Sequence, residues 1–300
     1  MPEKINEPLK NTAPDRRRRQ MLWAALPLLA GVGLAQAQTE LTDLDKVRAN
    51  GSLKVAVYKD NPPFASGPAA DIQGLDVALA GALARAMQLK LSLLPFDADE
   101  NMGDDLRNMV WKGHYLGFGP ADVMLQVPMD KYLLDDNPQV LVFGPYMRQT
   151  FVLLHDTTRI ATVNRAEDLK GLPLSAERGT GAASVLMGHG GGLLRNQVGI
   201  VNTGVQAAEA VIQGKAAAAY LTRAQAENAL FKAGLKAGGR YELTTLAFNG
   251  IPQNGWPVGM AVKKSNKALA QALVTALQSL RDSGELLKIF QQQGMTLTAP

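Results

Sequence analysis

The feature that most constrains the fold of this 300-residue chain is a hydrophobic period that switches repeatedly between two and four. Residues 53–57 alternate between apolar and other side chains, which predicts a strand, whereas Leu or Met recurs every fourth residue over 75–87, which predicts one apolar helix face. Apolar strand patterns return over 89–93 and 121–127. Strands that alternate with helices predict a mostly parallel sheet covered on both faces.

A second set of elements follows the first. The pattern predicts strands over 151–154, 216–221 and 258–262, a short helical turn over 168–171, and helices over 180–187, 203–212, 269–280 and through 290. Thr180 and Thr203 are placed to cap two of these helices, and Gly188 and Gly214 to end them. We therefore predict an α/β fold of two lobes, with the C-terminal tail returning to the first.

The composition is that of a globular protein with sizeable cores, since 46% of the residues are hydrophobic. The formal net charge of +4 at pH 7 suggests nucleic-acid or membrane binding, but the distribution of the charges along the chain does not support this. The whole sequence has 31 Lys or Arg and 27 Asp or Glu, of which residues 1–37 hold six and three. The rest of the chain therefore has 31 − 6 = 25 basic and 27 − 3 = 24 acidic residues. The basicity belongs to the N-terminus, and we expect no nucleic-acid partner.

The N-terminus has the pattern of an export signal. A polar stretch ends in Arg16-Arg17-Arg18-Arg19, an apolar core runs over 21–35, and Ala35-Gln36-Ala37 provides a small-x-small cleavage site. A retained transmembrane anchor is the alternative, which is disfavoured because the apolar run of about 15 residues is shorter than the roughly 20 that span a bilayer. Arg18-Arg19-Gln20-Met21-Leu22 also resembles a twin-arginine signal, so the Sec and Tat routes both stay open.

Export implies a periplasmic protein with no stable membrane insertion after cleavage. The sequence contains no Cys. It therefore forms no disulfides in that oxidising compartment, and its stability must come from packing.

Several segments, taken in order, resemble the type 2 periplasmic solute-binding proteins of the amino-acid (family 3) kind. The resemblance runs from Gly51 to about Met295 and is carried by GSLKVAVYKDNPPF, GLDVALAGALARAM, ADVMLQVPMD, VLVFGPY, DLKGLPLSAERGTGAAS and WPVGMAVKKSNKALAQALVTALQSLRDSGELLKIF. It implies a two-lobed type 2 periplasmic-binding-protein fold with two crossing strands as hinge, near 146–152 and 257–262. The implied division is a signal peptide over 1–37, a first lobe over 38–147 and 258–300, and a second lobe over 148–257. Ligand would bind in the cleft, and the lobes would close on it.

The resemblance also implies cleft positions, and here the sequence departs from the amino-acid-binding pattern. Family members place an Arg after a polar strand end to clamp the ligand α-carboxylate, a role that suits the bidentate guanidinium. The matching stretch, 126–132, contains no Arg, and the acidic residue that would hold the α-amino group is replaced at about Thr222, with Arg223 beside it. We therefore expect a small organic or anionic ligand, and not an ordinary zwitterionic amino acid.

The residues predicted to line the cleft combine aromatic, polar and turn positions: Tyr58, Phe64, Gln126, Pro128, Tyr146, Arg178, Gly179, Thr180, Gly181 and Thr222. Tyr58 and Phe64 follow the carboxyl end of a strand, where open α/β sheets bind ligands. The turn over 178–181 offers backbone N–H groups, a helix dipole and Arg178 to a carboxylate or another small anion. Alternatively, its glycines only make a strand-to-helix turn with Thr180 as cap, and both interpretations stay open.

An acidic stretch over 96–105, FDADENMGDD, holds five carboxylates in ten positions. As an EF-hand loop it fails, because position 6 is Met102 rather than Gly and position 12 is Asn108 rather than Glu. The sequence predicts instead that Asp104 or Asp105 caps a helix, with the acidic side chains favourable near its N-terminus. We assign no metal ligand, and a weaker cation site stays open.

The following stretch, 107–128, is longer than a usual helix-to-strand connection. Trp111, His114, Tyr115 and Phe118 are predicted to form an exposed aromatic loop that binds a partner, since such residues are enriched at interfaces. A loop folded over the lobe's own core is the alternative. The run RNMV followed by ADVMLQVP also resembles the binding-protein-like accessory proteins of PQQ-dependent methanol dehydrogenases, which implies a quinoprotein dehydrogenase as partner.

The sequence lacks the motifs of common enzyme classes. It has no Gly-x-Ser-x-Gly elbow, no His-Glu-x-x-His and no P-loop, and His114, His155 and His189 lack metal-ligand spacing. We predict a protein that is not an enzyme and has no catalytic residue, cofactor or metal. Three functions remain: a solute receptor working with an ABC permease, an accessory or maturation partner of a quinoprotein, and a divergent periplasmic enzyme on a solute-binding fold.

Overall fold

The computed structural model describes residues 41–300. The predicted signal peptide over 1–37 lies outside these residues, so the signal and its cleavage site stay predictions. Between Leu41 and Pro300, no helix is both long and apolar enough to cross a bilayer.

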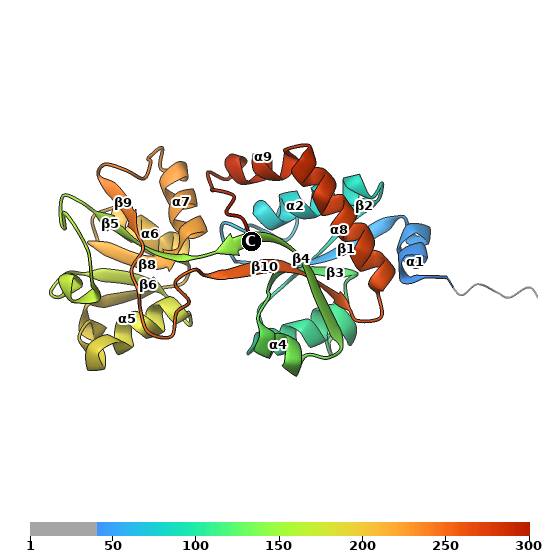
Figure 1. The fold of residues 1–300 in the computed structure, drawn as a ribbon, viewed down its shortest axis with the longest axis horizontal. Coiled ribbons are helices and arrows are strands. Elements are labelled where there is room, and N and C mark those ends of the chain that lie inside the picture. The colour runs from blue at the N-terminus through green and yellow to red at the C-terminus, as the bar shows by residue number, and fades with distance from the viewer. Residues whose placement is uncertain (1–40) are drawn as a thin grey trace, which may run out of the picture. The chain divides into compact units, whose positions relative to one another are not determined.

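The first sheet has five strands in the order β2-β1-β3-β10-β4 (Figure 1). Their bounds are Ser52–Tyr58 for β1, Lys90–Phe96 for β2, Val123–Pro128 for β3, Val140–Gln149 for β4 and Trp256–Lys263 for β10. Strand β1 pairs in parallel with β2 and β3, whereas β10 pairs antiparallel with β3 and β4. The predicted parallel strands therefore form one half of a mixed sheet.

Helices cover both faces of this sheet, as the alternation of strands and helices predicted. They are α1 Asp43–Asn50, α2 Leu75–Ala86, α3 Met102–Leu106, the π-helical turn η1 Arg107–Trp111, α4 Lys131–Asp136, α8 Lys267–Asp282 and α9 Glu285–Gln292. Leu53, Val55 and Val57 pack in one core with α2, α8 and α9, while Ala56 packs with α3 and η1 on the other face. This follows from the strand geometry, since successive side chains point to opposite faces.

The second sheet has the strand order β7-β6-β8-β5-β9. Its strands are β5 Phe151–Asp156, β6 Leu174–Glu177, β7 Val198–Val201, β8 Ala218–Thr222 and β9 Tyr241–Thr244, and the helices around it are η2 Ala166–Leu169, α5 Gly181–Gly192, η3 Arg195–Gln197, α6 Gly204–Ile212 and α7 Arg223–Lys232. Thr180 and Thr203 cap α5 and α6 as predicted, because each hydroxyl accepts a backbone N–H three residues on. The helical conformation of α5 is broken at His189, one residue after the predicted end.

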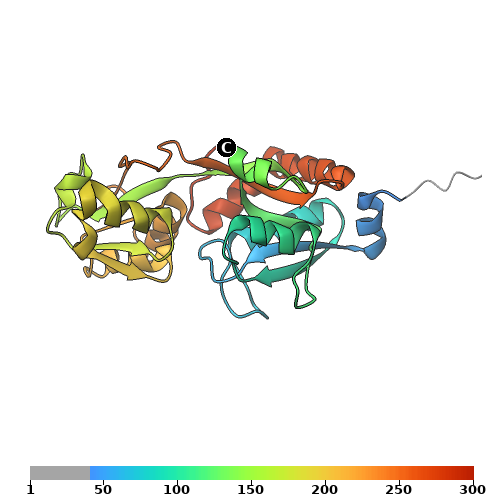
Figure 2. The same cartoon turned by 90° about the horizontal axis from the view of Figure 1, so that it is seen from below.

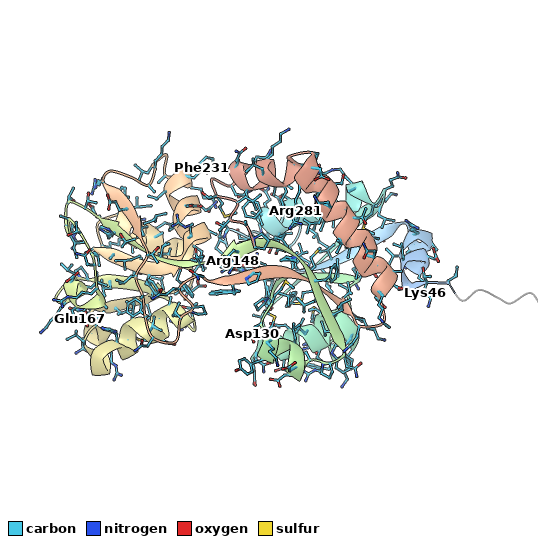
Figure 3. The ribbon with its side chains drawn as sticks, viewed as in Figure 1. Lys46, Asp130, Arg148, Glu167, Phe231 and Arg281 are labelled. Atoms are coloured by element: carbon cyan, nitrogen blue, oxygen red, sulfur yellow. The ribbon has the colours of Figure 1, made fainter. Side chains whose placement is uncertain are left out.

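Two adjacent strands connect the lobes (Figures 1 and 2). Only Thr150 separates β4 from β5, and β10 pairs along β4 as far as Trp256 opposite Gln149. Arg148 lies at this junction (Figure 3), where its guanidinium donates to the carbonyl oxygen of Asn254 at 3.1 Å. The predicted two-lobed α/β fold with crossing strands is confirmed.

The C-terminal segment makes a further contact between the lobes. Helices α8 and α9 pack on the first sheet, and the chain beyond α9 then meets α7 of the second lobe. Asn228 Nδ2 donates to the carbonyl oxygen of Gln293 at 2.8 Å, and Thr296 N donates to Glu227 Oε2 at 2.7 Å. The tail therefore returns to the first lobe, as expected, and also contacts the second.

Candidate functional site

A pocket of about 470 Å³ lies where the crossing strands meet the second lobe, and we call it the junction pocket. It is lined by Asn61, Gln149, Phe151, Glu177, Thr180, Gly181, Ala182, Tyr220, Leu221, Thr222, Gln225, Ile251 and Trp256. Asn61 follows β1 of the first lobe, and most other residues stand at strand ends of the second sheet or at the N-terminus of α5. Ligand pockets of α/β proteins form at such strand ends, and this volume suits a small organic molecule.

Three aromatic rings form one wall of the junction pocket. The ring centroids of Phe151 and Tyr220 lie 5.4 Å apart in a stacked arrangement, and those of Phe151 and Trp256 lie 5.5 Å apart at a 57° tilt. Tyr220 is buried, its ring also contacts Phe248, and its hydroxyl donates to the carbonyl oxygen of Leu246 at 3.3 Å. Burial raises the pKa of Tyr220 to about 12. The wall is therefore fixed by packing and offers flat apolar faces.

One carboxylate side chain, that of Glu177, lines the junction pocket. Burial raises the pKa of its carboxyl group, while the hydrogen bond from Gln225 Nε2 to Glu177 Oε2 at 2.9 Å opposes that rise. Gln225 in turn accepts from the hydroxyl and backbone N–H of Thr222 through its Oε1. A single amide thus orients both the carboxylate and the end of β8.

The N-terminus of α5 forms another part of the wall. The Thr180 hydroxyl donates to the carbonyl oxygen of Glu177 at 2.8 Å and accepts from Ala183 N at 3.3 Å. The cap interpretation of this turn is therefore confirmed. Thr180 and Gly181 line the pocket as predicted, but Arg178 and Gly179 do not. The guanidinium of Arg178, expected to aid an anion here, is thus not among the lining groups, whereas the first N–H groups of the helix are placed at the pocket.

Besides Arg178 and Gly179, five further residues predicted to line the cleft are not part of the junction pocket: Tyr58, Phe64, Gln126, Pro128 and Tyr146. Phe64 and Tyr146 are core residues with 2% and 0% of their surface exposed, so the prediction for them is wrong. Phe64 packs beside α2, where the first lobe has its main core. Pro128 is a paired residue of β3, opposite Val258.

Tyr146 and Gln126 belong instead to a buried polar network. The Tyr146 hydroxyl accepts from Gln126 N at 3.0 Å, and Gln126 Nε2 donates to Asp76 Oδ1 at 3.2 Å. Asp76 is fully buried, its Oδ2 has no hydrogen-bond partner, and burial raises its pKa to about 7. This network joins α2, β3 and β4 within the first lobe.

Tyr58 and the acidic stretch contact each other away from the junction pocket. The Tyr58 hydroxyl donates to Asp105 Oδ2 at 2.6 Å, and Asp105 Oδ1 accepts from Asp99 N at 2.8 Å. Helix α3 is capped by Asn101, whose side chain accepts from Asp104 N at 3.1 Å, so the prediction that Asp104 or Asp105 is the cap is wrong. Within residues 41–300, no cluster of His, Asp and Glu is arranged to hold a metal ion.

The predicted partner-binding residues divide into two groups. Trp111 is half-buried and packs against the core beneath η1, so for this residue the alternative of a loop folded on its own lobe is correct. In the second group, the His114 ring stacks on Phe118 and makes a tilted contact with Tyr115, and 88% of Tyr115 is exposed.

The sequence reasoning missed Phe151, Glu177, Tyr220, Gln225 and Trp256. Glu177 ends β6 and Tyr220 lies near the end of β8, so the rule that ligands bind at carboxyl ends of strands was a usable signal for both. Phe151 and Trp256 stand on the crossing strands, and no local pattern distinguishes them from core residues.

Comparison with solved structures identifies the fold. An ancestral cationic amino acid solute-binding protein superposes with a TM-score of 0.63 and 18% identity, over 84% of this chain and 99% of that one. A Streptococcus pneumoniae ABC uptake transporter substrate-binding protein with bound histidine gives a TM-score of 0.61 and 16% identity, over 86% and 98%. A solute receptor for L-cysteine of Neisseria gonorrhoeae gives 0.56 and 17%, over 83% and 92%. The chain has the two-lobed fold of these amino-acid solute-binding proteins, as its motifs predicted.

No protein-family model and no curated protein matches the sequence. At identities of 16–18%, the structural likeness establishes the fold, and the ligand has to be argued from the junction pocket itself.

Proposed function

We propose that this protein is a periplasmic solute-binding protein that holds a small organic ligand in the junction pocket and closes its lobes on it. The observation that carries the proposal is the aromatic wall of Phe151, Tyr220 and Trp256 facing one oriented carboxylate, Glu177, where strands from both lobes meet. The fold supports it, since the similar structures are those of solute-binding proteins and a solute receptor.

The lining chemistry favours a ligand with an amino group or another cation. Aromatic faces attract cations through their quadrupole, and Glu177 is the one charged side chain among the lining residues of the described chain. No Arg or Lys lines the pocket, so an anionic ligand would be repelled by Glu177 and held only by the N-terminus of α5. We therefore replace the expected anion with a cationic or amine ligand.

The same lining residues bear on whether an ordinary zwitterionic amino acid can be the ligand. The acidic partner expected at Thr222 is supplied by Glu177, from the neighbouring strand, whereas the Arg clamp for an α-carboxylate has no replacement in the lining. We propose that an α-carboxylate is not needed for binding. The ligand class is then an amine with a flat apolar body.

Three matched compounds test this ligand class: 2-phenylethylamine carries only the ammonium group, 3-phenylpropionate only the carboxylate, and phenylalanine both. In a Trp111→Phe background, Trp256 is the remaining Trp of residues 41–300, so its fluorescence reports the pocket. We expect saturable change with the amine and none with the carboxylate. Binding of the carboxylate alone, or of none of the three, would contradict the proposed class.

The solute-binding function itself is tested separately by native mass spectrometry of the protein purified without refolding from the periplasm of the producing cell. A retained adduct of a few hundred daltons that is lost on denaturation supports a receptor. An unchanged mass after ligand exchange, and no conversion of that ligand on incubation, supports binding without catalysis. If no compound is retained and none of many tested amines raises the melting temperature, the receptor function is wrong, because a ligand of the native state must stabilise it.

A permease is the partner that this function implies, and the periplasm is the location that the predicted signal implies. The quinoprotein partner is supported by no contact or comparison described above and stays a prediction. A specific surface on the first lobe nevertheless favours a protein partner of some kind, as argued next.

A further inference from the structure

We propose that a second pocket, on the first lobe and remote from the junction pocket, docks a partner protein that inserts a Lys or Arg side chain. This aromatic-acidic pocket has a volume of about 400 Å³ and is lined by Asp97, Ala98, Asp99, Asp105, Asn108, Met109, His114, Tyr115, Leu116 and Phe118. One wall is the acidic stretch that precedes α3, and the other is the aromatic loop that follows η1.

The conformation of the aromatic wall is fixed by backbone hydrogen bonds and ring contacts. His114 N donates to the carbonyl oxygen of Phe118 at 2.8 Å, and Gly117 N donates back to that of His114 at 2.9 Å, which closes a tight turn. The His114 ring stacks on Phe118 at 4.2 Å and contacts Tyr115 at 4.3 Å between centroids. The loop is also pressed against η1, because a Cβ on Gly119, whose φ is +72°, would stand 2.7 Å from the carbonyl oxygen of Asn108. Its rings are therefore positioned before any partner binds.

The rim of this wall is exposed apolar surface. Tyr115 and Leu116 expose 88% and 68% of their surface, and Phe118 exposes 36%. Three large apolar side chains within four residues are thus exposed together at this pocket, and clustered exposed apolar surface marks sites of interaction. Tyr is among the residues that contribute most binding energy at protein interfaces.

The acidic wall decides what the partner must present. Asp99 Oδ2 accepts from Asn108 Nδ2 at 2.9 Å, and Asp105 is buried behind it with its oxygens accepting from Tyr58 and from Asp99 N. Asp97 stands at the edge and pairs with the exposed Lys59 at 2.9 Å. Three carboxylates thus share a pocket with three aromatic rings, and no Lys or Arg is among its lining residues. Carboxylates and ring faces together select a cation.

The exposed rim indicates that the cation belongs to a protein rather than to a free amine. A small molecule that fills the pocket would contact its inner surface and leave most of Tyr115 and Leu116 in water. A partner surface that inserts a Lys or Arg covers the apolar rim around the charge, which matches the pattern of a buried anchor with surrounding contacts that exclude water. The sequence prediction of a partner-binding loop is thereby narrowed to His114, Tyr115 and Phe118 with the acidic wall.

A photo-cross-linking experiment tests this proposal on the full chain. A photoreactive amino acid replaces Lys112, which is exposed, adjoins the loop and does not line the pocket. The protein is expressed in the cell that produces it and irradiated, and the cross-linked partner peptide is sequenced. The same photoreactive residue at Glu209, exposed on α6 of the second lobe, measures non-specific yield. We expect one partner segment that contains a Lys or Arg.

Matched variants connect the cross-link to the pocket. We expect Tyr115→Ala and Asp99→Asn each to lower the yield about tenfold, which corresponds to about 1.4 kcal/mol. Tyr132→Ala and Asp135→Asn, an exposed Tyr and an exposed acid on α4 that do not line the pocket, should leave the yield unchanged. A synthetic peptide of the cross-linked segment should bind, and its Lys or Arg to Gln version should bind about tenfold more weakly.

Several outcomes overturn the proposal. These are a yield no higher than at Glu209, cross-links only to further copies of this chain, a partner segment without a basic residue, and yields that Tyr115→Ala leaves unchanged. Trp256→Phe should not alter the yield, so the outcome is independent of the solute-binding function proposed for the junction pocket.

Discussion

The junction pocket and the aromatic-acidic pocket use the same chemistry at different depths. Each combines aromatic rings with at least one carboxylate and has no Lys or Arg among its lining residues. In the junction pocket Tyr220 is 1% exposed and packed on Phe151, whereas in the other pocket Tyr115 is 88% exposed. Enclosed rings suit a ligand small enough to be surrounded, while rings at the surface suit a partner large enough to cover them. Burial, more than residue type, separates the two functions.

The largest effect that can break this comparison is on stability. Tyr220→Ala removes a buried ring that contacts Phe151 and Phe248, and we expect a loss of about 3–5 kcal/mol in the free energy of unfolding. Tyr115→Ala should change it by no more than about 0.5 kcal/mol, because its ring is mostly in water. Urea denaturation followed by circular dichroism measures both. Equal effects would mean that the two rings are not in different environments.

A fully buried carboxyl group, Asp76, extends the comparison to complete burial. Its folded pKa is raised to about 7, so the folded state holds its proton more tightly than the unfolded state, and stability from this group is lost as pH rises from about 4 to 7. The loss should reach a few kcal/mol by pH 8. We expect Asp76→Asn to flatten this part of the stability profile, measured by urea denaturation at several pH values. The exposed Asp99, substituted to Asn as a control, should leave the profile unchanged.

The two carboxylates that face the pockets should separate ligand binding from partner binding. Glu177→Gln removes the charge and keeps the shape, so the affinity of the junction pocket for 2-phenylethylamine should fall about tenfold, or about 1.4 kcal/mol. Asp99→Asn should leave that affinity unchanged. Isothermal titration calorimetry measures both variants. An unchanged affinity in Glu177→Gln would show that this carboxylate does not contact the amine.

The smallest expected effect concerns the turn that holds the aromatic wall. Gly119 has a φ of +72°, and a Cβ there would stand 2.7 Å from the carbonyl oxygen of Asn108. We expect Gly119→Ala to cost about 1 kcal/mol of stability and to shift the NMR signals of the His114 and Phe118 rings. Gly117→Ala is the matched control, because its φ is also positive but no atom lies within 4 Å of a Cβ there. Identical ring shifts in both variants would mean that the close contact does not position the rings.

Much of the fold was predictable because its signals are local. The apolar period predicted β1, α2 and α8 together with the faces that they bury, and Thr180 and Thr203 were recognised as helix caps. Helix α1 was missed although Thr42 and Asp45 form a capping box, a signal that was readable in the sequence. Helix α4 was missed too, since it spans only six residues and buries none of them.

The candidate site was predictable only in part. Thr180, Gly181 and Thr222 line the junction pocket as expected, because each stands at a strand end or helix start that the sequence reveals. Phe64 was assigned to the cleft because it follows a strand end, and Tyr146 because the family resemblance implied it, but both are core residues. Local pattern does not tell which side of a sheet an isolated ring will face.

The sequence by itself determined the elements with a clear hydrophobic period, such as β1, α2 and α8, the faces that they bury and the two-lobed α/β class, because hydrophobic period and helix capping depend on residues close together in the chain. Only the tertiary structure decided that Phe151, Tyr220 and Trp256 meet at one wall with Glu177, and that Asp99 faces Tyr115 across another pocket. The groups of the junction pocket are brought together by strand pairing between distant segments, whereas those of the aromatic-acidic pocket are brought together by the packing of the loops on either side of α3 and η1. Their burial, and with it the ligand or partner that each pocket suits, follows from contacts that no short stretch of sequence contains.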